Sequence, residues 1–84
     1  MKISPGDIKT KTADLAKAIG IKPAQIEART GKERGGTEIL LPLAAATEKE
    51  LWVAFLAVFP FVGMVDLRKE DDRHMVRIYD LQIE

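Results

Sequence analysis

The sequence predicts an α+β fold in which a small helical N-terminal part precedes one central apolar helix and a C-terminal β-hairpin. Three observations support this prediction. Residues that begin and end helices are concentrated in the first 31 positions, and a capping-box sequence introduces a long apolar stretch in the middle of the chain. Near the C-terminus, two segments rich in apolar residues flank a charged tip, which is typical of a β-hairpin.

The length and composition indicate one folded domain that spans residues 1–84. Hydrophobic residues make up 46% of the chain, an ordinary fraction for a globular protein. A chain of 84 residues buries only about 60–65% of the surface that its unfolded form exposes, so its stability margin is small. We therefore expect a dimer interface to supplement the core of the single chain.

The zero net charge conceals an uneven distribution along the chain. Residues 1–36 form a basic helical part with eight Lys or Arg against four Asp or Glu, which gives +4. Residues 37–84, which hold the core helix and the hairpin, carry five against nine, which gives −4. The N-terminal part can thus face a polyanion, although solvated surfaces also vary in charge without any partner.

The N-terminal part carries start and stop signals for short helices. Residues 4–7 (SPGD) form a turn or open a short first helix. A helix over residues 12–19 is expected to follow, because Thr12 can cap it and Gly20 suits the left-handed residue that ends it. A second helix over residues 23–28 begins on a proline, which the first position of a helix tolerates, and stops near the next glycine.

A glycine-rich connection and a short apolar segment follow. Residues 30–36 (TGKERGG) contain three glycines and separate the helical third from the rest of the chain. Residues 37–43 (TEILLPL) are rich in Ile and Leu, but Pro42 lacks the donor that a central strand needs. We therefore expect this segment to be an edge strand or an extended connector.

The strongest local signal lies in the middle of the chain. Thr47 and Glu50 form a capping box, in which each side chain satisfies a backbone N–H group of the first helical turn. The helix that this box begins, residues 48–59, is apolar on every side from Leu51 onward. A helix without a polar face should be enclosed by protein, either in the core of one chain or between two subunits.

The C-terminal segments 64–68 and 75–83 contain many apolar residues and flank the charged loop 69–73 (KEDDR). This pattern predicts a β-hairpin with a polar tip. The second of these strands carries apolar residues on both faces, so protein should cover both faces over part of its length.

The stretch from Thr12 to Gly31 resembles the helix-turn-helix of prokaryotic DNA-binding regulators. In that family a small residue sits where the second helix crosses the first, a glycine makes the turn, and apolar residues at fixed offsets lock the two helices together. The residues that match this pattern are Leu15, Ala16, Ile19, Gly20, Ile21 and Ile26.

The resemblance implies a helix-turn-helix-like pair and a small cytoplasmic protein that binds duplex DNA in transcription regulation and is homodimeric. The hairpin would then correspond to the wing of a winged-helix protein, although its acidic tip favours a structural role instead. Lysine and arginine side chains near the motif would neutralise phosphates. The candidate DNA-binding residues are Lys11, Lys17, Lys22, Gln25, Glu27, Arg29, Lys32 and Arg34.

An alternative function stays open, because two short helices can also pack together without reading DNA. Arg29 stands where the pattern places a third apolar residue, and the positions that would face a DNA groove offer few groups for hydrogen bonds to bases. The alternative is a non-catalytic protein–protein interaction module, such as an adaptor or an inhibitor of a larger protein. In either case Trp52, Phe55 and Phe59 are the candidate homodimer contacts.

Catalytic and metal sites find little support in the sequence, and we expect no enzymatic activity and no cofactor. His74 is the only histidine, cysteine is absent, and the only serine, Ser4, lies near the N-terminus. Acidic residues beside His74 are typical of a solvated hairpin tip, so we expect no metal. The absence of cysteine favours a cytoplasmic setting, and the longest apolar run, 51–65, is interrupted by Pro and Gly, so we expect no membrane span.

Overall fold

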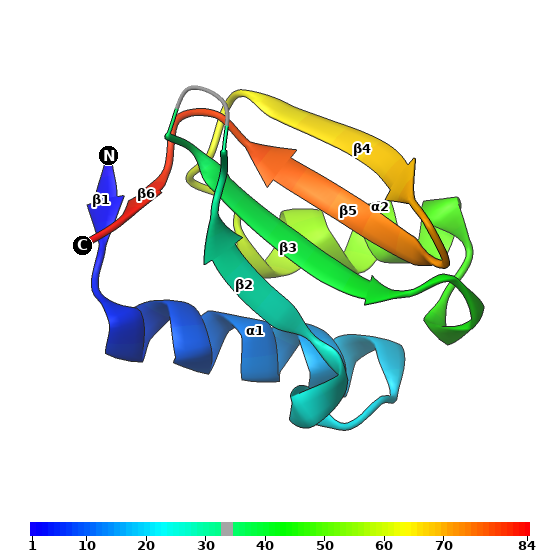
Figure 1. Cartoon of the computed structure of the whole chain (residues 1–84). Helices are drawn as coiled ribbons and strands as arrows, with labels where there is room; N and C mark the ends of the chain where they lie inside the picture. The colour runs from blue at the N-terminus through cyan, green and yellow to red at the C-terminus, as the bar shows by residue number, and fades with distance from the viewer. Residues whose placement is uncertain (33–34) are drawn as a thin grey trace.

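A computed structural model of the chain, which describes residues 1–32 and 35–84, shows the expected α+β class (Figure 1). A four-stranded antiparallel sheet has the strand order β2-β3-β5-β4, and a short parallel pair joins β1 to β6 near the two termini. Helices α1 and α2 lie on one face of the four-stranded sheet, and no helix in the described part of the chain covers the other face (Figure 1). The elements are β1 (Lys2–Ile3), α1 (Pro5–Ile19), the 3₁₀ turn η1 (Pro23–Gln25), β2 (Glu27–Thr30), β3 (Thr37–Pro42), the 3₁₀ turn η2 (Leu43–Ala45), α2 (Glu48–Val58), β4 (Val65–Glu70), β5 (Arg73–Ile78) and β6 (Gln82–Ile83).

Helix α1 begins earlier than predicted. Ser4 caps it, because the Ser4 Oγ accepts a hydrogen bond from the Asp7 N–H at 3.1 Å, and Pro5 occupies the first helical position. Thr12 therefore lies inside the helix, where its hydroxyl donates to the Lys9 carbonyl at 3.0 Å. The predicted end is confirmed, since Gly20 adopts a left-handed conformation with φ 78° and ψ 31°.

The predicted second helix of the helix-turn-helix-like pair is wrong. Its first three residues form the single 3₁₀ turn η1, and the chain then enters strand β2, which pairs with β3. Ile26 and Ala28 alternate with Glu27 and Arg29, and the first two pack against the core. Pairing with β3 thus overrides the local helical signals, because a period of two buries the same apolar residues that a short helix would.

Strand β3 is central rather than at an edge. It pairs with β2 on one side and with β5 on the other, and Ile39, Leu40 and Leu41 are fully buried. Pro42 is the last residue of the strand, so its missing N–H group interrupts no hydrogen bond in the middle of the sheet. The proline that suggested an edge strand instead marks the end of a central one.

Helix α2 confirms the predicted capping box but is not enclosed all round. The Thr47 Oγ1 accepts from the Glu50 N–H at 3.1 Å, and the Glu50 Oε1 accepts from the Thr47 N–H at 2.9 Å. Leu51 and Phe55 are buried against the sheet and α1, whereas Leu56 on the outer side is 54% exposed. The described part of the chain therefore covers only one side of this apolar helix.

The C-terminal hairpin is confirmed, but its first strand is longer than predicted and its second strand is shorter. Strands β4 and β5 pair through a two-residue turn in which Asp71 adopts a positive φ of 55°. Strand β5 ends at Ile78, and the chain then turns so that β6 can pair with β1. The parallel β1–β6 pair lies beside the start of α1 (Figure 1) and places the two ends of the chain side by side.

A steric prediction follows from the close packing of Gly36 on β5. A Cβ atom at Gly36 would lie 2.6 Å from the Ile78 carbonyl oxygen, and backbone at this position cannot move aside without disturbing the sheet. We expect Gly36→Ala to lower the free energy of unfolding by about 1–3 kcal/mol in urea denaturation. The matched control is Gly6→Ala in the first turn of α1, where the nearest atom is 4.0 Å away, and this change should leave the protein equally or more stable. Equal stability of the two variants would contradict the prediction.

Candidate interaction surface

The face of the sheet that no helix covers carries a network of ion pairs centred on Glu38. The Arg29 Nε donates to the Glu38 Oε1 at 2.8 Å, and the Arg77 Nη2 donates to the Glu38 Oε2 at 2.9 Å. Arg29 also donates through Nη2 to the Glu70 Oε2 at 2.9 Å. Because these residues come from β2, β3, β4 and β5, the network connects all four strands of the sheet.

The pKa of Glu38 is lower than its ordinary value despite its burial. Only 3% of the residue is exposed, and burial by itself raises the pKa of a carboxyl group. Hydrogen bonds from the Arg29 and Arg77 guanidinium groups outweigh that effect and lower the pKa. Glu38 is therefore an ionised carboxylate whose two oxygen atoms are both occupied within the chain.

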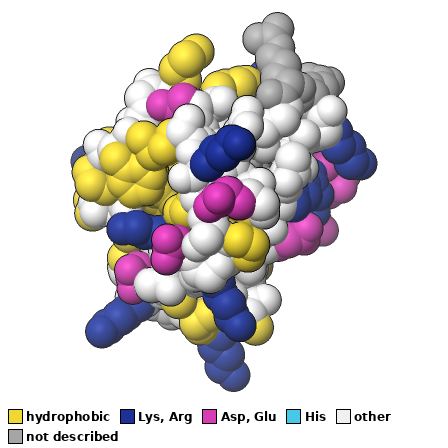
Figure 2. Space-filling model, turned by 90° about the vertical axis from the view of Figure 1, so that its left-hand side faces the viewer, with side chains coloured by type: hydrophobic (Ala, Val, Ile, Leu, Met, Phe, Trp, Pro, Cys, Tyr) yellow, Lys and Arg dark blue, Asp and Glu magenta, His cyan; other side chains and the backbone are white. Residues whose placement is uncertain are grey.

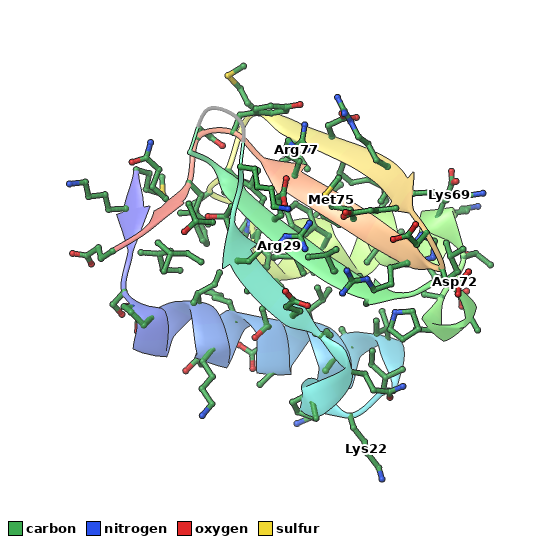
Figure 3. All side chains as sticks on the ribbon, in the orientation of Figure 1. Lys22, Arg29, Lys69, Asp72, Met75 and Arg77 are labelled. Carbon is green, nitrogen blue, oxygen red and sulfur yellow. The ribbon has the colours of Figure 1, made fainter. Side chains whose placement is uncertain are left out.

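Apolar side chains lie beneath the charges on this uncovered face. Leu40 and Met75 point to the side of the sheet opposite the helices, yet Leu40 is fully buried and Met75 is 5% exposed. The labelled Arg29, Met75 and Arg77 lie together over the front of the sheet in Figure 3. Long arginine side chains can cover apolar neighbours with their methylene groups while their charged ends are paired. The face is thus closed by its own side chains.

The predicted DNA-binding residues do not form one surface. Arg29 belongs to the Glu38 network, the Gln25 side chain accepts from the Lys22 N–H at 3.2 Å, and Glu27 accepts from Arg73 at 3.0 Å. Lys11 lies over the Phe61 ring, with its Nζ 5.5 Å from the ring centroid. Arg34 lies outside the described residues. Lys17, Lys22 and Lys32 are exposed.

A second surface, on the helical side, is apolar and exposed. We define the α2 outer surface as Val53 and Leu56 on α2 together with Phe61 shortly after it, whose exposed fractions are 66%, 54% and 39%. Figure 2 shows a group of hydrophobic side chains on its left, the side on which α2 lies, and charged side chains over the centre, the right and the lower part of the view. Between α1 and α2 this side also holds an apolar groove of about 520 Å³, lined in part by Ala18, Ala46 and Ala57. Sequence analysis missed these residues, although the apolar outer face of the helix was a signal for them.

Of the three predicted dimer contacts, two are in the core. Phe55 and Phe59 are fully buried within the chain, and their rings stack with centroids 4.8 Å apart. Neither ring is therefore accessible to a second subunit in this fold. Trp52 is partly buried and meets the Phe55 ring edge to face, with centroids 6.1 Å apart.

His74, which the sequence offered as a candidate for chemistry, has a partner at only one of its two ring nitrogen atoms. It is 3% exposed, and its Nε2 donates to the Ala46 carbonyl at 2.7 Å, which ties the residue after η2 to the sheet. The buried Nδ1 has no hydrogen-bond partner in the described part of the chain. Among residues 1–32 and 35–84, no three His, Asp or Glu side chains are grouped to hold a metal ion. No helix in the same described ranges is long and apolar enough to cross a membrane.

Comparisons of the chain with protein-family models, with curated proteins and with solved structures find no match.

The Glu38 network generates a prediction about stability and pH. We expect Glu38→Gln to lower the free energy of unfolding at pH 7 by about 2 kcal/mol, because two partly buried guanidinium groups lose their carboxylate. A carboxyl group whose pKa is lowered by folding stabilises the protein above its unfolded pKa, and this contribution is lost as the pH falls through the folded pKa. The difference between wild type and Glu38→Gln should therefore shrink as the pH is lowered past about 4.3.

Urea denaturation at a series of pH values measures both effects. The control is Asp66→Asn, which breaks the exposed Asp66–Arg68 pair of 2.6 Å and should cost less than about 1 kcal/mol. A difference between wild type and Glu38→Gln that does not change with pH would show that the charge of Glu38 contributes nothing.

Proposed function

We propose that this protein is a non-catalytic protein–protein interaction module that self-associates through the α2 outer surface. The observation that carries the proposal is the exposure of Val53, Leu56 and Phe61 on α2 and shortly after it. Large apolar side chains that stay exposed near one another are typical of an interface. Full burial of one such side chain is worth roughly 1.5–3 kcal/mol, so even partial coverage of three is a substantial driving force.

The contrast with the uncovered sheet face supports this choice. There, the carboxylate of Glu38 and the guanidinium of Arg29 already have partners within the chain, so a ligand would have to break existing ion pairs in order to bind. On the α2 side, association breaks no ion pair, because Val53 and Leu56 are apolar and the only charged group over Phe61 in the described part of the chain is the Lys11 ammonium, which can move into solvent. The zero net charge of the chain also leaves little long-range repulsion between two copies.

Solution mass measurements test the proposal. Light scattering coupled to size-exclusion chromatography should give the wild type a mass near twice the 9.3 kDa of one chain at micromolar concentration. Leu56→Asp should give a folded 9.3 kDa species, because it places a charge in the middle of the contact. The matched control is Ala24→Asp in the exposed turn η1, which should leave the mass unchanged. A wild type that stays at 9.3 kDa over this range would refute self-association.

DNA binding is a second proposal, supported by exposed lysines beside the end of α1. Lys17 and Lys22 flank the left-handed Gly20, and neither forms an ion pair within the described residues. Such cations would bind phosphates without reading bases, because the recognition helix of a helix-turn-helix is not formed here.

The prediction for this second proposal is a salt-dependent gel shift. Binding to duplex DNA at low salt should weaken steeply as salt increases, and Lys17→Glu with Lys22→Glu should abolish it. The control, Lys49→Glu on the first turn of α2, reverses the same kind of charge elsewhere. No retention of DNA by the wild type at low salt would refute DNA binding.

A further inference from the structure

Strand β4 is an edge of the sheet with unpaired backbone groups along one side. It pairs with β5 only, and nothing in the described part of the chain lies beyond it (Figure 1). The Tyr79 N–H donates to the Met64 carbonyl at 2.8 Å, which makes these two residues a hydrogen-bonded pair. Because such pairs alternate along an antiparallel ladder, Val65, Leu67 and Lys69 direct their N–H and C=O groups toward the free edge.

The same edge has an apolar flank. Val65 and Leu67 are partly buried against the core on the helical side of β4. The Lys69 Nζ lies 3.9 Å from the Glu48 Oε1, which places the first turn of α2 near β4. Trp52 follows Glu48 by one turn and therefore lies on the β4 side of α2, whereas Leu56, a further turn along, lies between this side and the outer side of the helix. A strand added to β4 would set its inward side chains against these groups.

The charges of β4 are complementary to those of a second, antiparallel β4 strand when the two strands align in one register. Asp66 and Arg68 lie on the uncovered face, one on each side of Leu67, and form an exposed ion pair of 2.6 Å with each other within one chain. Because this pair is exposed, a second strand can add its own charges to it without uncovering a buried group. When two β4 strands run antiparallel with Leu67 opposite Leu67 of the partner subunit, Asp66 faces Arg68 of the partner subunit, and the reverse pair forms by symmetry. These are non-hydrogen-bonded pairs, in which opposite side chains approach most closely.

The two neighbouring registers with the same hydrogen-bonding alternation are unfavourable. A shift in one direction places Asp66 opposite Asp66 of the partner subunit, and a shift in the other places Arg68 opposite Arg68 of the partner subunit. The favoured register also forms about six backbone hydrogen bonds between the subunits, two at each of its three hydrogen-bonded pairs.

We infer that two copies of this chain join along their β4 strands about a two-fold axis at Leu67, forming one continuous eight-stranded sheet. This inference rests on the proposed self-association and narrows its contact to the β4 side of the α2 outer surface, because Val53 instead lines the groove beside α1. Trp52 and Leu56 contribute the apolar part of the contact, and β4 contributes the backbone pairing and the register. The other edge strand, β2, is less suited, because it has four residues against the six of β4.

Charge exchange between positions 66 and 68 tests the register. Asp66→Arg alone, or Arg68→Asp alone, places like charges opposite each other at two symmetric positions and should raise the dimer dissociation constant by about 100-fold or more. The double variant Asp66→Arg with Arg68→Asp restores both pairs and should again form the dimer. A 1:1 mixture of the two single variants should form a heterodimer, because one subunit carries only arginines and the other only aspartates at these positions.

Sedimentation or light scattering of each sample, with circular dichroism to confirm folding, gives the result. Single variants that dimerise as well as the wild type, or a mixture that remains monomeric, would overturn the β4 register while leaving self-association through α2 intact. Hydrogen exchange supplies an independent measurement, because dimerisation should protect the Leu67 and Lys69 amides in the wild type. A dimer in which these amides exchange as fast as in Leu56→Asp would also overturn the inference, whereas a monomeric wild type would refute both proposals.

Discussion

The buried carboxylate of Glu38 is the interaction on which the architecture of the sheet depends. It sits on the central strand β3 and accepts from Arg29 of β2 on one side and Arg77 of β5 on the other. An isolated carboxylate with 3% exposure would be strongly unfavourable, and hydrogen bonds from both arginines are what stabilise the ionised Glu38 in this position. When β2 and β5 pair with β3, their arginines also reach Glu38, so strand pairing and compensation of the Glu38 charge occur together. This explains why a face without helices can still be buried.

This constraint also explains which parts of the fold the sequence could predict. The α2 capping box, the left-handed Gly20 and the β4–β5 hairpin depend on neighbouring residues, so their signals are present in short stretches of sequence. Strand β2 depends on β3, whose residues follow a glycine-rich connection. Arg29 does not fit the pattern of a short packed helix, because its partner Glu38 lies on β3, beyond that connection. The same arginine is the expected outward residue of a strand.

The candidate surfaces were predictable to a different degree. The sequence indicated that α2 has no polar face, but it could not distinguish Phe55, which the chain buries, from Leu56, which it leaves exposed. That distinction depends on which side of the helix meets the sheet and α1, a property of tertiary packing. Likewise, the predicted DNA contacts were close in sequence, yet strand formation from Glu27 onward moved Glu27 and Arg29 onto the sheet, away from the lysines of α1.

The uncovered face and the β4 edge of the sheet differ in how far their polar groups are already paired, and this difference bears on function. Around Glu38 on the uncovered face, the charged groups pair with one another, so specificity for a partner must come from the edge of the sheet. Strand β4 has three properties of a pairing edge: free backbone groups, an apolar flank, and the opposite charges of Asp66 and Arg68. These two residues face opposite charges on a second β4 strand only when the two strands run antiparallel. Charges on an edge strand usually prevent uncontrolled pairing. Here they would admit one register and exclude its neighbours.

Self-association would also act on the stability of the fold. A domain of 84 residues has little surplus core, and the exposed side of α2 is apolar area that the single chain does not bury. A second copy that covers Leu56 and pairs with β4 would bind only the folded state, and a ligand of the folded state shifts the unfolding equilibrium by mass action. The contact that carries the proposed function would therefore stabilise the strand at the edge of the sheet, where pairing with β5 alone leaves half of the backbone groups without a partner strand.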